Sequence, residues 1–149
     1  MDNHDGMTLI VRTVTRVMVW IIMVYGAYII LHGHLTPGGG FGGGVILALA
    51  FLAVFLAFGR TFTARWLNLT ALHETESSAV LLFLLMGIAG IVAGEAFFSN
   101  VIGTGHLFDL ISAGGIPLLN VFIGVKVAVA LFVVVWMLSS IDLEKGGEP

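Results

Sequence analysis

Four long runs of apolar residues dominate the chain, and short polar segments separate them. Each run is close to the length of about 20 residues that a helix needs to cross the hydrocarbon core of a bilayer. The pattern therefore predicts an all-α membrane protein with four transmembrane helices and no soluble domain. The predicted helices cover residues 17–31, extended at the start by the segment TLIVRTVTR, and then residues 44–58, 78–98 and 117–141.

Composition supports this interpretation and excludes several other classes. Of the 149 residues, 58% are hydrophobic and 10% are charged, against roughly 45–50% and 25% in soluble domains. The formal net charge of −3 includes no basic cluster that would hold a nucleic-acid backbone, so we exclude nucleic acid as a partner. Because the chain has no cysteine, it has no disulfide and no cysteine-ligated metal centre, and we expect no cofactor.

The positive charges predict how the helices are oriented. Five basic residues fall on one side of the predicted helices, and they are Arg12, Arg16, Arg60, Arg65 and Lys145. The loops on the other side contain no lysine or arginine. Since short loops rich in lysine and arginine stay in the cytoplasm, we expect both termini to be cytoplasmic.

The segment LTPGGGFGGGVIL, residues 35–47, places six glycines around one phenylalanine. Residues 38–45 match the spacing G-x-G-x-x-G-x-V of a nucleotide-binding loop. Such a loop follows a strand in a soluble site and needs a lysine or an acid nearby, whereas here a membrane helix precedes it, so we reject nucleotide binding. We predict a glycine-rich outer loop between the first two helices, and the alternative is a flexible turn without further meaning.

Small residues at helical spacing predict close contacts with neighbouring helices. Glycines four residues apart let two backbones approach closely, and a second set of glycines lines one side of the third predicted helix. Phe41 is a large side chain among these glycines and suits a groove in a partner subunit. The residues predicted to pack against other subunits are Gly38, Gly39, Gly40, Phe41, Gly42, Gly43, Gly87, Gly90 and Gly94.

Two ionisable residues inside the predicted helices are candidates for an ion pathway. At 1.5 Å per residue, Lys126 and Glu95 lie about 22 and 25 Å from the cytoplasmic ends of two antiparallel helices, and therefore at nearly one depth. An isolated lysine in a bilayer costs about 2.5–3.5 kcal/mol, so each charge needs a partner or a water-filled cavity. The pair is either a proton or sodium relay or a structural ion pair. Alternatively, Lys126 snorkels outward and Glu95 is an interfacial carboxylate.

The other polar residues carry weaker signals. His73, Glu74 and Glu76 open the third predicted helix, where we expect Thr75 or Ser77 to cap the helix and the acidic residues to suit its N-terminus, so we assign this group a capping role. Three histidines lie on the outer side, and they are His32, His34 and His106. No carboxylate motif completes a metal site with them, so we predict no metal and keep His34 only as a further ion-pathway candidate.

The run LHGHLTPGGGFGGGV, with VRTVTR before it and an apolar helix after it, resembles the signature of the MnhB/MrpB family of multisubunit cation/proton antiporters. The resemblance covers essentially the whole chain, residues 1–149, as one transmembrane domain, and its specific part is the G-G-G-F-x-G-G core. It implies a multi-pass subunit in the plasma membrane of a prokaryote. Its partners would be the lipid bilayer and the other membrane subunits of an Mrp-type complex that exchanges Na⁺ for H⁺. The subunit would brace or line a cation pathway without being an enzyme.

The resemblance leaves the identity of the complex open. The same module occurs in archaeal membrane-bound hydrogenases and sulfur reductases, where the homologous subunit belongs to the sodium-translocating part. Lys126 departs from the bacterial antiporter pattern and favours this second group. A self-sufficient homo-oligomeric transporter is the third hypothesis, but it would need several intramembrane ionisable groups or inverted repeats.

Overall fold

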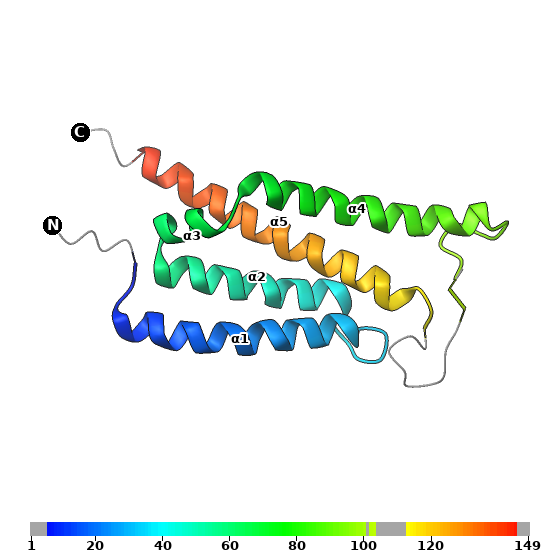
Figure 1. The fold of residues 1–149 in the computed structure, drawn as a ribbon, viewed down its shortest axis with the longest axis horizontal. Coiled ribbons are helices and arrows are strands. Elements are labelled where there is room, and N and C mark those ends of the chain that lie inside the picture. Colours follow the sequence, from blue (N-terminus) through cyan, green and yellow to red (C-terminus); the bar gives the residue numbers. More distant parts are fainter. Residues whose placement is uncertain (1–5, 101, 104–112, 146–149) are drawn as a thin grey trace.

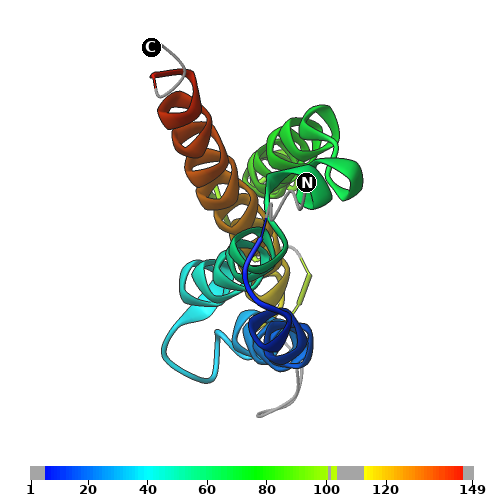
Figure 2. The same cartoon turned by 90° about the vertical axis from the view of Figure 1, so that its left-hand side faces the viewer.

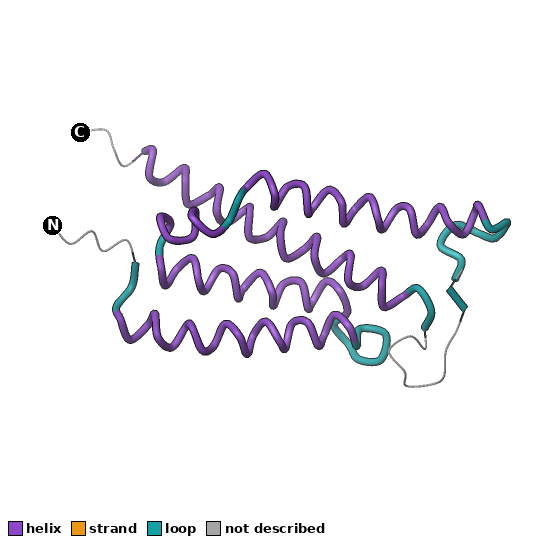
Figure 3. Tube along the Cα trace, in the orientation of Figure 1, coloured by secondary structure: helices purple, strands orange, loops and turns teal. Residues whose placement is uncertain are grey.

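The computed structural model describes residues 6–100, 102–103 and 113–145, and for residues 140–145 it describes the backbone alone. This part of the chain forms helices and connecting loops without any strand (Figure 1, Figure 3). The helices are α1 (Leu9–Leu31), α2 (Gly39–Phe58), α3 (Arg60–Trp66), α4 (Leu69–Val92) and α5 (Ile116–Lys145). By length and composition, α1, α2, α4 and the Ile116–Ser139 part of α5 can each cross a membrane. The predicted all-α protein with four membrane-spanning helices is therefore confirmed.

The glycine run begins a helix instead of forming a loop. α2 starts at Gly39, so only residues 32–38 connect it to α1, and the predicted glycine-rich loop is wrong for residues 39–44. Each glycine costs a helix roughly 1 kcal/mol relative to alanine. A bilayer offers no water to unpaired backbone groups, and this favours the helix. Gly38 and Gly39 take φ angles of 130° and 58°, which suit glycine at the start of the helix.

α4 begins nine residues before the predicted position and also ends earlier. The side chain of Asn68 accepts a hydrogen bond from the Thr70 backbone N–H at 3.0 Å, which caps the first turn. At the other end, Gly94 has a φ of 80°. Its N–H donates to the Ile91 carbonyl at 2.9 Å, and the Glu95 N–H donates to the Gly90 carbonyl at 2.9 Å. This pair of bonds is a Schellman motif, which ends the helix before Glu95.

The helices form a chain of pairwise contacts. α1 packs on α2, α2 packs on α5, and α5 packs on α4, with a smaller contact between α1 and α5, whereas α4 contacts neither α1 nor α2 among the described residues. Figure 2 shows α5 crossing past α2, with α1 and α4 on opposite sides. The start of α1, the short helix α3 and the end of α5 lie at one end of the bundle (Figure 1). We call this the basic end, because it carries Arg12, Arg16, Arg60 and Arg65.

α2 packs between α1 and α5. Ala48 and Ala50 of α2 are buried, and Phe51 meets Phe132 of α5 edge to face with the ring centroids 6.1 Å apart. Nearer the basic end, Phe55 packs on Trp136 at 5.2 Å. Most large apolar side chains of α1 and α4 are exposed, as expected for helices that lipid or other membrane subunits surround.

Candidate ion-pathway site

An ion pair joins α4 to α5 inside the membrane-spanning part of the fold. The Nζ atom of Lys126 lies 3.5 Å from the Oε1 atom of Glu76, and the two side chains are 43% and 25% exposed. Lys126 is about 15 Å from the start of α5, and Glu76 is about 10 Å from the start of α4. Both residues belong to helices long and apolar enough to cross a bilayer. Each charge therefore has the partner that an intramembrane ionisable group requires.

The predicted pairing of Lys126 with Glu95 is wrong. Glu95 lies beyond the end of α4, in the turn that the Schellman motif closes, and its side chain is exposed. It follows the end of α4, which lies at the end of the bundle opposite the basic end (Figure 1). The prediction placed the start of α4 at residue 78, which left Glu76 outside the helix and carried the helix past Glu95. With the start at Leu69, Glu76 takes the position across from Lys126.

A histidine extends this ion pair toward the basic end. The Nδ1 atom of His73 lies 4.0 Å from the Oε2 atom of Glu76, one helical turn away, and this contact is an ion pair only when His73 is protonated. His73, Glu76 and Lys126 thus form a continuous line of ionisable side chains, which we call the polar line. The cap expected from Thr75 or Ser77 is wrong, because Asn68 caps α4 and the segment of His73, Glu74 and Glu76 lies inside the helix.

Beyond Lys126 the surroundings become apolar. A cavity of about 140 Å³ lies between α4 and α5, and its lining consists of Ala79, Val80, Phe83, Phe122, Ile123 and Lys126. The α4 residues of this lining follow Glu76, so the cavity continues from the ion pair away from the basic end. A buried water needs two to four polar partners. Lys126 is the only polar side chain in the lining, so the described residues alone do not carry water or an ion further.

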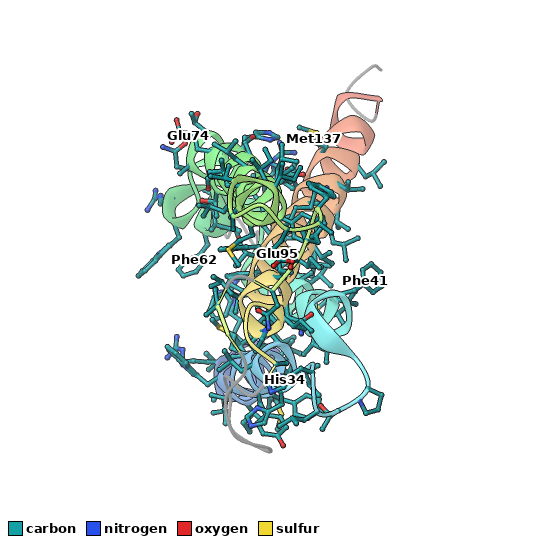
Figure 4. All side chains as sticks on the ribbon, turned by 90° about the vertical axis from the view of Figure 1, so that its right-hand side faces the viewer. His34, Phe41, Phe62, Glu74, Glu95 and Met137 are labelled. Carbon is teal, nitrogen blue, oxygen red and sulfur yellow. The ribbon has the colours of Figure 1, made fainter. Side chains whose placement is uncertain are left out.

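The outer histidines lie apart from the polar line. His34 belongs to the connection between α1 and α2, next to the end of α1 in Figure 4, and it does not line the Lys126 cavity. The ring of His32 stacks on Tyr28 with the centroids 4.1 Å apart. Within the described ranges no three histidine, aspartate or glutamate side chains form a metal-binding group. His106 lies outside the described residues.

Two glycines of α2 make close helix contacts within the chain itself. A Cβ atom added at Gly44 would lie 2.6 Å from the carbonyl oxygen of Gly124 in α5. One added at Gly43 would lie 2.8 Å from the carbonyl oxygen of Gly26 in α1. Both positions are buried, and α2 is held between its two neighbours by contacts that only glycine permits. The neighbouring helices thus belong to the same chain, which corrects the assignment of Gly43 to contacts with another subunit.

Asn120 makes a similar contact near the start of α2, and the sequence reasoning missed it. Its Oδ1 atom accepts a hydrogen bond from the Gly40 N–H at 3.4 Å. A Cβ atom at Gly40 would overlap the main-chain oxygen of Asn120. The Nδ2 atom is buried and has no hydrogen-bond partner among the described residues. Asn120 is the only amide side chain inside the four predicted spans, and this sequence feature could have identified it as a residue of a helix contact.

Other residues of the predicted packing set face outward. Phe41 is 67% exposed and projects away from the bundle (Figure 4). A Cβ atom at Gly42 would meet no atom within 4 Å. These two positions are open on the surface of the chain, and their contact with a neighbouring subunit stays a prediction.

The glycines of α4 serve the loop that follows this helix. A Cβ atom at Gly87 would lie 2.8 Å from the ring of Phe97, and one at Gly90 would lie 3.0 Å from the backbone nitrogen of Ser99. Gly94 supplies the positive φ of the helix end. Their periodic spacing therefore reflects the returning segment 93–100 and the end of the helix, and it does not form a face for another transmembrane helix.

Four apolar spans with lipid-accessible faces and an internal ion pair define a multi-pass integral membrane protein. The chain belongs to the family described as "Domain related to MnhB subunit of Na+/H+ antiporter", which matches residues 10–133. The resemblance found in the sequence is thereby confirmed.

Individual relatives come from archaea and bacteria. The chain is 34% identical over 138 residues to an uncharacterized protein of Methanocaldococcus jannaschii, a match that covers 89% of this chain and 52% of that protein. It is 48% identical over 50 residues to a candidate antiporter subunit, mnhB2, of Staphylococcus saprophyticus, covering 34% of this chain and 36% of that one.

A solved structure shares the fold. It is the membrane-bound sulfane sulfur reductase, an archaeal respiratory membrane complex, one chain of which superimposes with a TM-score of 0.71 at 34% sequence identity. The match covers 84% of this chain and 55% of that chain. This chain therefore spans about half the length of its archaeal relatives.

Proposed function

We propose that this chain is an accessory membrane subunit of an Mrp-type module that exchanges Na⁺ for H⁺, and that it lines part of a cation pathway while other subunits carry the rest. Membership of the MnhB family and the four apolar spans support this role. The observation that carries it is the Glu76–Lys126 ion pair, which places two charges inside a span and leaves the lysine 43% exposed. Intramembrane ionisable residues of this kind mark ion pathways and proton relays.

The polar line suggests how the pathway works. A cation that enters from the basic end reaches His73 first and then the Glu76 carboxylate, which already faces Lys126. The cation and the Lys126 ammonium compete for that carboxylate, so occupancy of Glu76 by the cation releases the lysine. Because the cavity beyond Lys126 is apolar, the next polar group belongs to another subunit that covers the exposed side of the lysine.

The competing hypothesis is a purely structural ion pair, and charge-neutralising variants separate the two. In membrane vesicles, we expect Glu76→Gln to lower sodium-coupled proton movement at least tenfold per assembled complex, because the carboxylate that receives the cation is lost. Glu95→Gln is the matched control, since the same chemical change at an exposed turn should leave transport unchanged. Equal transport by both variants would refute the pathway role.

A double variant tests the structural alternative directly. Removal of one member of an ion pair inside the membrane leaves an uncompensated charge and is destabilising, whereas removal of both is often tolerated. If the pair is structural, Lys126→Met alone should reduce assembly, and Lys126→Met with Glu76→Gln should restore both assembly and transport. If the pair is part of the pathway, the double variant should restore assembly and leave transport impaired.

The complex to which this subunit belongs has a second candidate, a redox-driven respiratory assembly. The fold match to the sulfane sulfur reductase covers 84% of this chain, whereas the match to the antiporter subunit covers 34%. Extraction of the native complex in mild detergent followed by mass spectrometry distinguishes the two. Co-purified reductase or hydrogenase subunits would assign the chain to a respiratory complex, and their absence from an intact assembly with antiporter subunits would assign it to an antiporter.

A further inference from the structure

A second cavity opens at the basic end, on a different face of the bundle from the polar line. It is a groove of about 410 Å³ between α1, α2 and α3. Its volume is within the range of roughly 300–1,000 Å³ that is usual for small-molecule sites. None of its lining residues contributes to the Lys126 cavity.

The groove is charged at its mouth and apolar along its depth. On α1 its lining residues Arg16, Trp20 and Met23 follow one another at helical spacing, so the groove extends about 10 Å from the arginine toward the middle of the bilayer. On α2 the lining runs in the same direction from Phe58 to Phe51. An occupant that matches this lining has an anionic group at one end and an apolar tail.

Aromatic rings form the wall of the groove near the membrane surface. The rings of Phe58 and Phe62 stack with their centroids 4.9 Å apart, and Phe62 is 6.3 Å from Trp66. Trp66 is 79% exposed and Trp20 is 66% exposed. Tryptophan is enriched where a membrane meets water, so these positions indicate that the mouth of the groove lies at the level of the lipid headgroups.

The charge at the mouth has no acidic partner among the described residues. Within the described residues, ion pairs form between His73 and Glu76 and between Glu76 and Lys126, and none involves Arg16. The Arg16 guanidinium lies 6.0 Å from the centroid of the Phe58 ring, at the edge of the groove. Arg12 lies one helical turn away on the same side of α1, which adds to the positive potential. An anionic ligand would therefore gain a charge-assisted interaction there.

We propose that the groove binds one anionic phospholipid, with its phosphate at Arg16 and one acyl chain along Trp20, Met23 and Phe51. A membrane supplies this amphipathic ligand at the depth of the groove. An apolar helix of a partner subunit would fill the lower part but leave the arginine unmatched. The bound lipid would connect α3 to α1, two elements that do not otherwise contact each other among the described residues.

Tryptophan quenching by brominated lipids tests this proposal on the full chain. The chain has three tryptophans, and Trp136→Phe leaves only the two that line the groove. This variant is reconstituted in phosphatidylcholine vesicles that contain increasing fractions of brominated phosphatidylglycerol or brominated phosphatidylcholine. We expect half-maximal quenching at an about fivefold lower fraction of the anionic lipid, the factor expected for one interfacial arginine.

Arginine variants identify the binding position. Arg16→Gln should abolish the preference for phosphatidylglycerol, whereas Arg65→Gln should retain it, because Arg65 carries the same charge at the same end but does not line the groove. Arg16→Lys should retain most of the preference. If Arg16→Gln does not fold, Val54→Phe fills the groove without changing a charge and should weaken quenching by the anionic lipid.

Three results would overturn the proposal. Equal quenching by the two lipids would mean that the groove is in contact with ordinary bilayer lipid only. An unchanged preference in Arg16→Gln or in Val54→Phe would place the lipid elsewhere. Absence of quenching by either lipid in the intact complex, together with quenching in the isolated chain, would mean that another subunit occupies the groove.

Discussion

The strongest prediction concerns the contact between α2 and α5, and it compares two glycines that are two residues apart. In Gly44→Ala the new methyl group would lie 2.6 Å from the carbonyl oxygen of Gly124 and 2.9 Å from the Cβ atom of Val127. Neither atom is at the end of a flexible side chain, so the helices must separate. In Gly42→Ala the methyl group would meet no atom within 4 Å. Gly42→Ala is therefore a control with the same chemical change.

The size of the effect follows from the comparison. Overpacking of a close contact costs about 1–3 kcal/mol. Both substitutions gain roughly 1 kcal/mol of helix propensity, and this gain cancels when the variants are compared. We expect Gly44→Ala to have a free energy of unfolding about 1–3 kcal/mol lower than that of Gly42→Ala.

The assay is unfolding of the full chain in mixed micelles of mild detergent and sodium dodecyl sulfate, followed by helical ellipticity and tryptophan fluorescence. Gly43→Ala provides a second crowded position, because its methyl group would lie 2.8 Å from the carbonyl oxygen of Gly26 in α1. If Gly44→Ala and Gly43→Ala unfold at the same detergent fraction as Gly42→Ala, the glycines do not hold α2 against its neighbours, and the packing argument is refuted.

Three further predictions concern orientation, assembly and helix capping. Leu35→Cys should react with an impermeant thiol reagent from outside intact cells and Ala64→Cys should not; labelling of Ala64→Cys alone would reverse the orientation inferred from the arginines. Phe41→Ala should reduce recovery of the multisubunit complex severalfold without changing the unfolding of the isolated chain, and normal recovery would mean that Phe41 faces lipid. Asn68→Ala should lower the free energy of unfolding by about 1 kcal/mol while Asn68→Asp retains it, because the lost interaction is the cap of α4.

The membrane-spanning helices could be predicted from the sequence because an apolar run of about 20 residues has the length of a helix that crosses the hydrocarbon core of a bilayer. The position of Glu76 could not, since the segment before residue 78 is polar and looks like a loop. What places it in α4 is the cap at Asn68, a local signal that hydropathy does not register. An error of nine residues at a helix start was enough to exchange Glu76 for Glu95 as the partner of Lys126.

The glycine run shows a second limit of the sequence. Its spacing correctly indicates a close approach of backbones, and no pattern within the run says which backbones approach. The structure assigns Gly43 to α1 and Gly44 to α5, and leaves Gly42 facing outward. Adjacent residues on a helix point in directions about 100° apart, so one run serves two neighbours and still presents a third face. Which face meets which helix depends on tertiary packing.

The chain of pairwise contacts has a consequence for biogenesis. Because α4 touches only α5 among the described helices, it has no partner in its own subunit while the ribosome is still making the segment that follows it. Glu76 enters the translocon at that stage without Lys126. Until α5 emerges, the insertion of α4 therefore carries the free-energy cost of an unpaired carboxylate in the membrane. The two helices then enter the lipid most favourably as a pair, and the lysine that completes the ion pair also stabilises α4, the third span, in the membrane.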